Sequence, residues 1–140
     1  MIGLESTLSG IVRAAAPIVI AAQGELITER AGVINLSLDG SIMLSAMTAH
    51  AVTRTTGSLT QGVLAAMAVG AAMAFVVVFS SIALRLNQVA VGFVLTILGA
   101  DLAIFLGKPH FNQVGREIPH LPIPVLKDIP LIGPVLFNHN

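Results

Sequence analysis

The chain has 140 residues, of which 55% are hydrophobic and only 10% are charged. Soluble domains usually carry about 25% charged residues, so this composition argues against a soluble enzyme. Seven Lys and Arg balance seven Asp and Glu, and this zero net charge argues against nucleic-acid binding. Cys is absent, which removes disulfides, thiolate metal sites and cysteine nucleophiles.

The first predicted transmembrane helix covers residues 8–27, which are apolar apart from Arg13 near one end and Glu25 near the other. About 20 apolar residues are enough to cross the hydrocarbon core of a bilayer. The long side chain of Arg13 can reach the interface. Pro17 lies inside this span and removes one helical hydrogen bond, so we expect a kink there.

The second predicted span, residues 33–52, is apolar but carries Asn35, Ser37, Asp39 and Gly40 in its first half. A carboxylate or irregular backbone at membrane depth is stable only where it lines a protein cavity or faces a partner helix. We therefore predict a break in the helix near Asp39-Gly40. In the alternative interpretation, Asp39 is the N-cap of a shorter helix that begins at Gly40 and follows an interfacial loop.

Two further spans are predicted at residues 59–84, which contain no charge, and 89–107, which contain one, Asp101. The short connection over residues 85–88 implies that these helices are antiparallel neighbours. Small residues recur at every fourth position of the third span and predict a helix-packing face. They are Gly62, Ala66, Gly70 and Ala74.

Residues 108–140 hold six of the seven prolines, which excludes a spanning helix and predicts an extramembrane Pro-rich loop. No new element begins before Asn140, so we expect residues 1–140 to be the N-terminal part of a single transmembrane domain. The predicted fold class is an all-α membrane protein, a polytopic bundle of about four transmembrane helices.

No pattern for nucleotide binding, metal binding or catalysis is present. Lys108 follows a glycine but precedes Pro109, so the phosphate-binding loop motif is missing. The four histidines lack metal-ligand spacing. Asp39 and Asp101 are not in the Gly-x-Gly-Asp context of membrane aspartic proteases. We expect no catalytic residue, no metal and no cofactor in this chain, and we expect any ATP to be used by another subunit.

Residues 21–44, AAQGELITERAGVINLSLDGSIML, resemble the hallmark segment of permease subunits of ATP-binding-cassette (ABC) importers for nucleosides. These permeases belong to the ribose and branched-chain amino acid permease superfamily. So many ordered matches are more specific than a short motif. The matching positions are Gly24, Glu25, Leu26, Glu29, Arg30, Gly32, Val33, Ile34, Asn35, Asp39 and Gly40.

Two later segments extend the resemblance. Residues 85–99 resemble the family's turn into a later helix, and residues 129–137 resemble its long external loop. The family usually has Glu at Asp39, an acidic residue near Asn87 and Asn at Thr96. These departures leave the permease class intact and bear on the identity of the ligand.

The resemblance implies a transport subunit that forms the translocation pathway of an ATP-driven importer, with nucleosides as the expected substrate and a simple sugar as the alternative. It also implies three protein partners: an ABC ATPase subunit, a second permease subunit and an extracytoplasmic substrate-binding protein. The expected location is the bacterial cell inner (plasma) membrane, as a multi-pass protein within the lipid bilayer. A structural membrane subunit that transports nothing is the alternative from a different class.

The candidate site residues form two groups. We predict that four polar residues line or brace the substrate pathway: Asn35, Ser37, Asp39 and Thr96. A second group is predicted to form a structural turn at the membrane surface: Glu25, Glu29, Arg30, Gly32 and Gly40. Asp101 is expected to brace the bundle.

Two arguments about orientation disagree. Arg30 and Arg85 fall on one membrane face, whereas Arg13, Arg54 and Lys108 fall on the other, which slightly favours a cytoplasmic N-terminus. The resemblance instead places the Pro-rich loop outside the cell. We follow the resemblance, so the predicted topology has the N-terminus outside and Arg30 and Arg85 in the cytoplasm.

Overall fold

The computed structural model describes residues 3–110 of the chain, and in this range every regular element is a helix. The elements, in chain order, are α1 (Leu4–Arg30), α2 (Leu38–Thr56), α3 (Leu59–Ile82), α4 (Gln88–Gly107) and the 3-10 turn η1 (Lys108–His110). The predicted all-α class is therefore confirmed. Except for η1, the predicted Pro-rich loop lies outside the described residues.

Three segments of the described residues are long and apolar enough to cross a membrane: Thr7–Arg30, Leu59–Ile82 and Gln88–His110. The second predicted span, residues 33–52, is divided in the structure between a non-helical segment, residues 33–37, which ends in a turn and is termed the extended segment, and the helix α2. α2 is more polar than the other helices because it carries Asp39 near its start, Arg54 near its end and several hydroxyl side chains between them.

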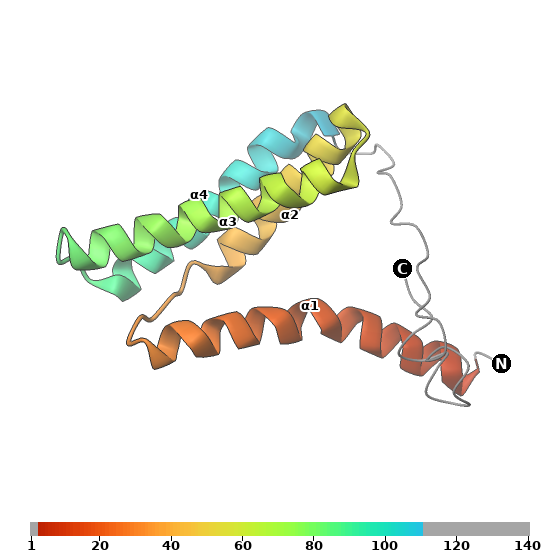
Figure 1. Ribbon diagram of the computed structural model, residues 1–140, viewed down its shortest axis with the longest axis horizontal. Helices are drawn as coiled ribbons and strands as arrows, with labels where there is room; N and C mark the ends of the chain where they lie inside the picture. Colours follow the sequence, from red (N-terminus) through yellow and green to blue (C-terminus); the bar gives the residue numbers. More distant parts are fainter. Residues whose placement is uncertain (1–2, 111–140) are drawn as a thin grey trace. The chain divides into compact units, whose positions relative to one another are not determined.

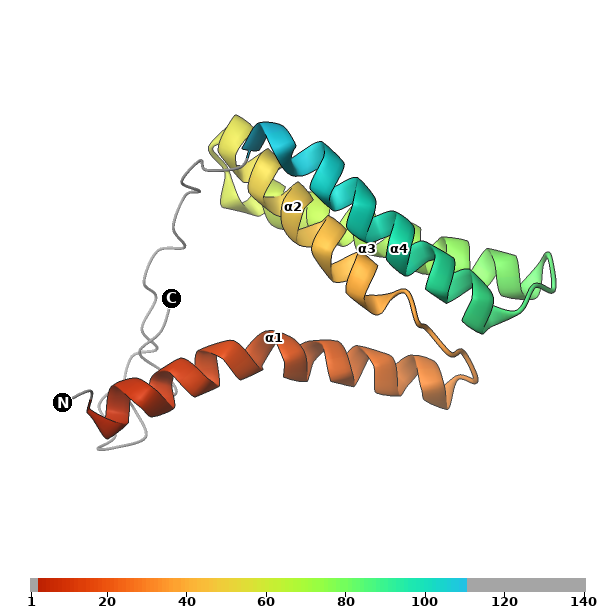
Figure 2. The same ribbon diagram turned by 180° about the vertical axis from the view of Figure 1, so that it is seen from behind.

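α1 continues as a helix through Pro17. Its ribbon bends near the middle in both views (Figures 1 and 2), as expected where a proline removes a backbone hydrogen bond. α1 is divided between two compact units of the chain, because the first unit includes residues up to Gly24 and the second begins at Glu25. The last turns of α1 therefore belong with α2, α3 and α4.

α2, α3 and α4 lie side by side, and α2 contacts both of the other helices (Figures 1 and 2). The turns between them are short and capped. Gly57 ends α2 in a left-handed conformation, and Ser58 accepts a hydrogen bond from the backbone N–H of Gln61 at the start of α3. These turns make α2 and α4 parallel to each other, with α3 antiparallel to both.

The buried core of this bundle is small. Met73, Val77 and Leu95 form its centre, whereas many large apolar side chains are exposed, among them Met67 at 65% and Phe75 at 66%. Such exposure is unfavourable in water and is expected for helices that face lipid or further helices. The apolar surface therefore agrees with three spans long enough to cross a bilayer.

Candidate functional site

An extended segment, residues 33–37, lies along the first turns of α4. The backbone N–H of Ile34 donates to Oε1 of Gln88 at 3.0 Å, and the hydroxyl of Thr96 donates to the carbonyl oxygen of Leu36. Between these two bonds, a Cβ atom at Gly92 would lie 2.9 Å from the nitrogen of Leu36. The extended segment therefore packs directly on the backbone of α4 and runs in the same direction.

The entry into α2 lies well inside the bundle. Thr96 follows Gln88 by eight residues, or about 12 Å along the helix axis. The residues from Gln88 onward are long and apolar enough to cross a membrane, and a hydrocarbon core is about 30 Å thick. α4 itself has 20 residues, or about 30 Å, so the chain beside Thr96 lies more than a third of the way along this helix. Both views show the first turn of α2 set back from the end where α4 begins (Figures 1 and 2).

α2 and α4 touch through their backbones where α2 begins. A Cβ atom at Gly40 would lie 2.5 Å from the carbonyl oxygen of Thr96, and one at Gly99 would lie 2.8 Å from the carbonyl oxygen of Gly40. Both separations are shorter than any ordinary carbon–oxygen contact. Glycine is therefore required at both positions for this close approach.

Asn35 satisfies the polar groups that precede α2. Its Oδ1 accepts hydrogen bonds from the backbone N–H of Ser37 at 3.1 Å and from the Ser37 hydroxyl at 2.6 Å. The Ser41 hydroxyl then donates to the carbonyl oxygen of Ser37 at 2.8 Å. Ser37 is 0% exposed, so these bonds are needed to offset the cost of burying its polar groups.

Glu25 joins the end of α1 to the same segment. Its Oε1 accepts a hydrogen bond from the backbone N–H of Asn35 at 3.3 Å, and its Oε2 accepts one from the Thr28 hydroxyl at 3.2 Å. Gly32, with φ of +79°, reverses the chain after α1. Glu29 and Arg30 are exposed, and no side chain in residues 3–110 forms an ion pair with either.

The predicted pathway residues have different surroundings. The side chains of Asn35, Ser37 and Thr96 each form a hydrogen bond within the extended segment or between it and α4. Asp39 lies in the first turn of α2 and is exposed, with no hydrogen bond or ion pair to its side chain in the described part of the chain. Asp39 is thus the one predicted pathway residue whose side chain forms no hydrogen bond among the described residues.

The predicted helix break takes a different form in the structure. α2 is continuous from Leu38 to Thr56, and the irregular backbone ends at Ser37, before Asp39-Gly40. The alternative of a loop followed by a shorter helix is closer, but the N-cap is Ser37 and not Asp39. Because Asn35 satisfies Ser37, the helix begins at once and places the Asp39 carboxylate in its first turn, where the helix dipole favours a negative charge.

The predicted packing face of α3 follows α2 over only part of its length. Gly62 is buried, and a Cβ atom there would lie 2.8 Å from the carbonyl oxygen of Ala49. Ala66 and Gly70 are half-buried, but Ala74 is exposed and Met73 is buried instead. A four-residue repeat drifts by about 40° per step on a helix with 3.6 residues per turn, so it leaves the contact face after three steps.

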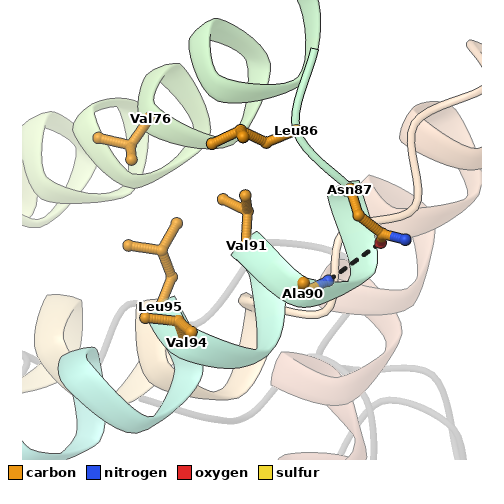
Figure 3. Close-up of a pocket in the computed structure, with 7 residues that line it drawn as sticks. All are labelled: Val76, Leu86, Asn87, Ala90, Val91, Val94 and Leu95. Atoms are coloured by element: carbon orange, nitrogen blue, oxygen red, sulfur yellow. Dashed lines mark hydrogen bonds between the residues drawn. The ribbon is translucent and has the colours of Figure 1, made fainter. Parts of the chain in front are cut away.

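A pocket of about 390 Å³ lies between the end of α3 and the start of α4 (Figure 3). Asn87 is its only polar lining residue, and the Asn87 Oδ1 already accepts from the backbone N–H of Ala90 at 3.2 Å. The lining is therefore almost entirely apolar. The lining residues are Val76, Leu86, Asn87, Ala90, Val91, Val94 and Leu95.

The remaining charged and metal-ligating side chains form no cluster. Among residues 3–110, no three His, Asp or Glu side chains could hold a metal ion together. His50 and His110 contact each other edge to face, with ring centroids 6.5 Å apart. Asp101, the other carboxylate on an apolar helix, is exposed and forms no ion pair within the described residues.

Sequence reasoning placed Thr96 of α4 in the site but missed three other residues of this helix. Gln88, Gly92 and Gly99 all contact residues 34–40, yet no pattern in the sequence links two segments so far apart. The Asn87-Gln88 pair of polar residues before an apolar helix was the available signal. Asn87 caps α4 in the structure, but the pair gives no indication of a partner.

Three apolar helices of spanning length, together with one polar helix entered through an extended segment, define a multi-pass membrane protein. The family model described as "Branched-chain amino acid transport system / permease component" matches residues 7–117, and the chain belongs to this family. The match covers α1 through α4, including the segment that packs on α4.

Three curated relatives resemble the chain. It is 37% identical over 135 residues to "Putative glucose ABC transporter permease protein TsgC13" of Haloferax volcanii, covering 94% of this chain and 41% of the relative. It is 28% identical to the guanosine ABC transporter permease NupQ of Bacillus subtilis, with 89% and 42% covered. It is 25% identical to the nucleoside ABC transporter permease NupC of Lactococcus lactis, with the same shares covered.

The chain spans about two fifths of the length of these relatives. No solved structure matches it.

Proposed function

We propose that the chain forms part of the translocation pathway in the permease subunit of an ABC importer. Family membership and the names of the relatives support this class of protein. The observation that carries the proposal is the free carboxylate of Asp39, on a helix that begins well inside the bundle. A carboxylate at that depth is costly unless it faces a polar path or partner, and broken membrane segments commonly form transporter sites.

We propose a nucleoside as the transported solute. The resemblance of residues 21–44 to nucleoside permeases and two relatives named for guanosine and nucleosides support this class. The second candidate is a simple sugar, which is favoured by the higher identity to the relative named for glucose. Both solutes carry hydroxyl groups that an ionised carboxylate can accept hydrogen bonds from.

We propose that the chain works in an assembly with three other protein chains. A separate ATPase chain hydrolyses ATP, a second permease subunit completes the pathway, and an extracytoplasmic protein delivers the solute. Family membership supports each of these roles in general terms. The proposed location is the bacterial inner membrane, with the N-terminus outside and Arg30 and Arg85 in the cytoplasm.

The test is uptake by the complete permease, co-expressed with its ATPase and binding protein and reconstituted in proteoliposomes. ATP-dependent accumulation of labelled guanosine, with glucose unable to compete, is the expected result. Accumulation of glucose would select the second candidate. No uptake of either solute by a well-assembled complex would contradict both and favour a structural subunit.

Asp39→Leu and Asp39→Asn test the role of the carboxylate in the same assay. We expect uptake to fall at least about tenfold in both, because a hydrogen bond to a charged group contributes about 1.5 to 3 kcal/mol. Asp101→Asn is the matched comparison, since Asp101 is the other exposed carboxylate on the α2–α4 bundle. Equal uptake by wild type and the Asp39 variants, at equal amounts of assembled protein, would exclude a pathway role for Asp39.

A further inference from the structure

We infer that Gln88 and Thr96 of α4 are positioning residues that set the depth at which α2 begins, and thereby hold Asp39 at its place in the pathway. The inference gives a role to Gln88, which the proposed function does not use, and to Thr96, which was predicted to line or brace the pathway. It rests on the proposed function only where transport is the readout, because the position of Asp39 can be measured without transport.

The side chains of Gln88 and Thr96 each form one hydrogen bond to the extended segment, at two positions along α4. Gln88 accepts from the backbone N–H of Ile34 at 3.0 Å, across 54 residues of sequence. Thr96 donates to the carbonyl oxygen of Leu36, across 60 residues. The residues between the two bonds lie on Gly92, where no side chain separates the segment from α4. Because Gln88 and Thr96 are eight residues apart on α4, or about 12 Å along its axis, the two bonds define a position along the helix as well as a contact.

These bonds are necessary because the non-helical backbone cannot pair all of its own polar groups. A helix pairs its own N–H and C=O groups, but a non-helical segment inside a membrane protein needs partners from elsewhere in the protein. In the described residues, Gln88 and Thr96 supply those partners for Ile34 and Leu36. Asn35 is held separately by Glu25. α4 therefore determines where the segment ends and α2 begins.

The position of Asp39 depends entirely on this backbone. The Asp39 side chain has no hydrogen bond of its own in the described part of the chain, and it follows Leu36 by three residues. The backbones of Gly40 and Thr96 are in close contact, so α2 has no room to take a slightly displaced position on α4. Loss of the bond at Leu36 removes the deepest fixed point before Asp39, so the first turn of α2 becomes free to shift along α4.

The experiment measures the position of residue 39 directly. This chain contains no Cys, so Asp39→Cys introduces a single thiol into it. The complete permease, assembled with its ATPase, is labelled in open membranes with a water-soluble maleimide, in wild-type, Thr96→Val and Gln88→Leu backgrounds. Thr96→Val keeps the shape of the side chain and removes only the hydroxyl. We expect the labelling rate to rise by about threefold to tenfold, the equilibrium factor for one lost hydrogen bond.

Conservative and matched variants separate positioning from a general loss of stability. Thr96→Ser keeps the donor and Gln88→Glu keeps the acceptor, so both should label at the wild-type rate. Thr55→Val removes an exposed hydroxyl that bonds only within its own helix, and Gln61→Leu changes an exposed residue in the first turn of α3. Both controls should also label at the wild-type rate. A purely structural role would reduce the amount of assembled protein without changing the rate per molecule.

The outcomes distinguish this inference from the proposed function. An unchanged labelling rate in both Thr96→Val and Gln88→Leu overturns the inference, whether or not the protein transports. A raised labelling rate, together with no uptake of guanosine or glucose by the same permease carrying Asp39, supports the positioning role and contradicts the proposed function. If Thr96→Val does not assemble, Gln88→Leu decides alone, because Gln88 lies at the start of α4 where less structure depends on it. With Asp39 restored, transport by Thr96→Val should show a raised KM.

Discussion

α3 and the extended segment before α2 show two ways of placing a chain inside a membrane protein. α3 is apolar along its whole length, pairs its own backbone groups and begins at a local cap, Ser58. Residues 33–37 are non-helical, and backbone groups of Ile34, Asn35, Leu36 and Ser37 are paired by the side chains of Gln88, Glu25, Thr96 and Asn35. The first region depends on local sequence, whereas the second depends on residues far away along the chain. The extended segment should therefore be the more sensitive of the two to single substitutions.

The largest effect is expected at the backbone contact between α2 and α4. Gly40→Ala would place a methyl group 2.5 Å from the carbonyl oxygen of Thr96, and backbone atoms cannot move aside as a flexible side chain can. We expect a loss of about 3 kcal/mol of stability or more. The amount of monodisperse permease after detergent extraction measures it. Gly10→Ala is the control, because nothing lies within 4 Å of its added Cβ, and equal yields of the two variants would contradict the contact.

A smaller loss is expected when Asn35 is replaced. Asn35→Ala leaves the backbone N–H and hydroxyl of the buried Ser37 without their acceptor. An unsatisfied buried polar group costs about 1 to 3 kcal/mol, which should appear as a lower thermal unfolding temperature in detergent. Asn35→Asp retains an acceptor oxygen at the same position and should recover most of the loss. If both variants unfold at the same temperature, the acceptor is not the reason that Asn35 is needed.

The smallest effects are expected within the regular α2–α3 contact, where two glycines of one packing face should differ. Gly62→Ala would bring a methyl group against Thr53 and within 2.8 Å of the carbonyl oxygen of Ala49, and should destabilise by about 1 to 2 kcal/mol. Gly70→Ala meets only the Ser45 hydroxyl, at 3.8 Å, and should be neutral or stabilising because alanine favours a helix by about 1 kcal/mol. The thermal unfolding temperatures of the two variants are compared. A lower temperature for Gly70→Ala than for Gly62→Ala would show that the packing face of α3 is not aligned on α2 as described.

The sequence predicted the regular parts of this protein well. The predicted spans at residues 59–84 and 89–107 agree with α3 and α4 to within a few residues, because long uncharged apolar runs leave few alternatives to a helix. The resemblance over residues 21–44 identified the permease family that the comparison shows. Both predictions depend on local sequence patterns, which can be recognised in one sequence without knowledge of its tertiary contacts.

For the irregular part of the chain before α2, the sequence predicted the location but not the structure. Asn35, Ser37 and Asp39 indicated that residues 33–40 could not form a plain membrane helix, but the sequence did not show where the helix would begin. That point depends on Gln88 and Thr96, more than 50 residues away. Ala74 was placed on the packing face for a similar reason, since a regular repeat does not show where the neighbouring helix diverges.

The sequence by itself determined that this is an all-helical membrane protein with one polar, irregular span, because hydrophobicity and backbone satisfaction act over short stretches of chain. Only the tertiary structure decided that α2 begins beside Thr96, that Gly40 and Gly99 must lack side chains, and that the Asp39 side chain forms no hydrogen bond among the described residues. An extended backbone inside a membrane protein is stable only when other helices complete its hydrogen bonds. Its position is therefore a property of the packed bundle.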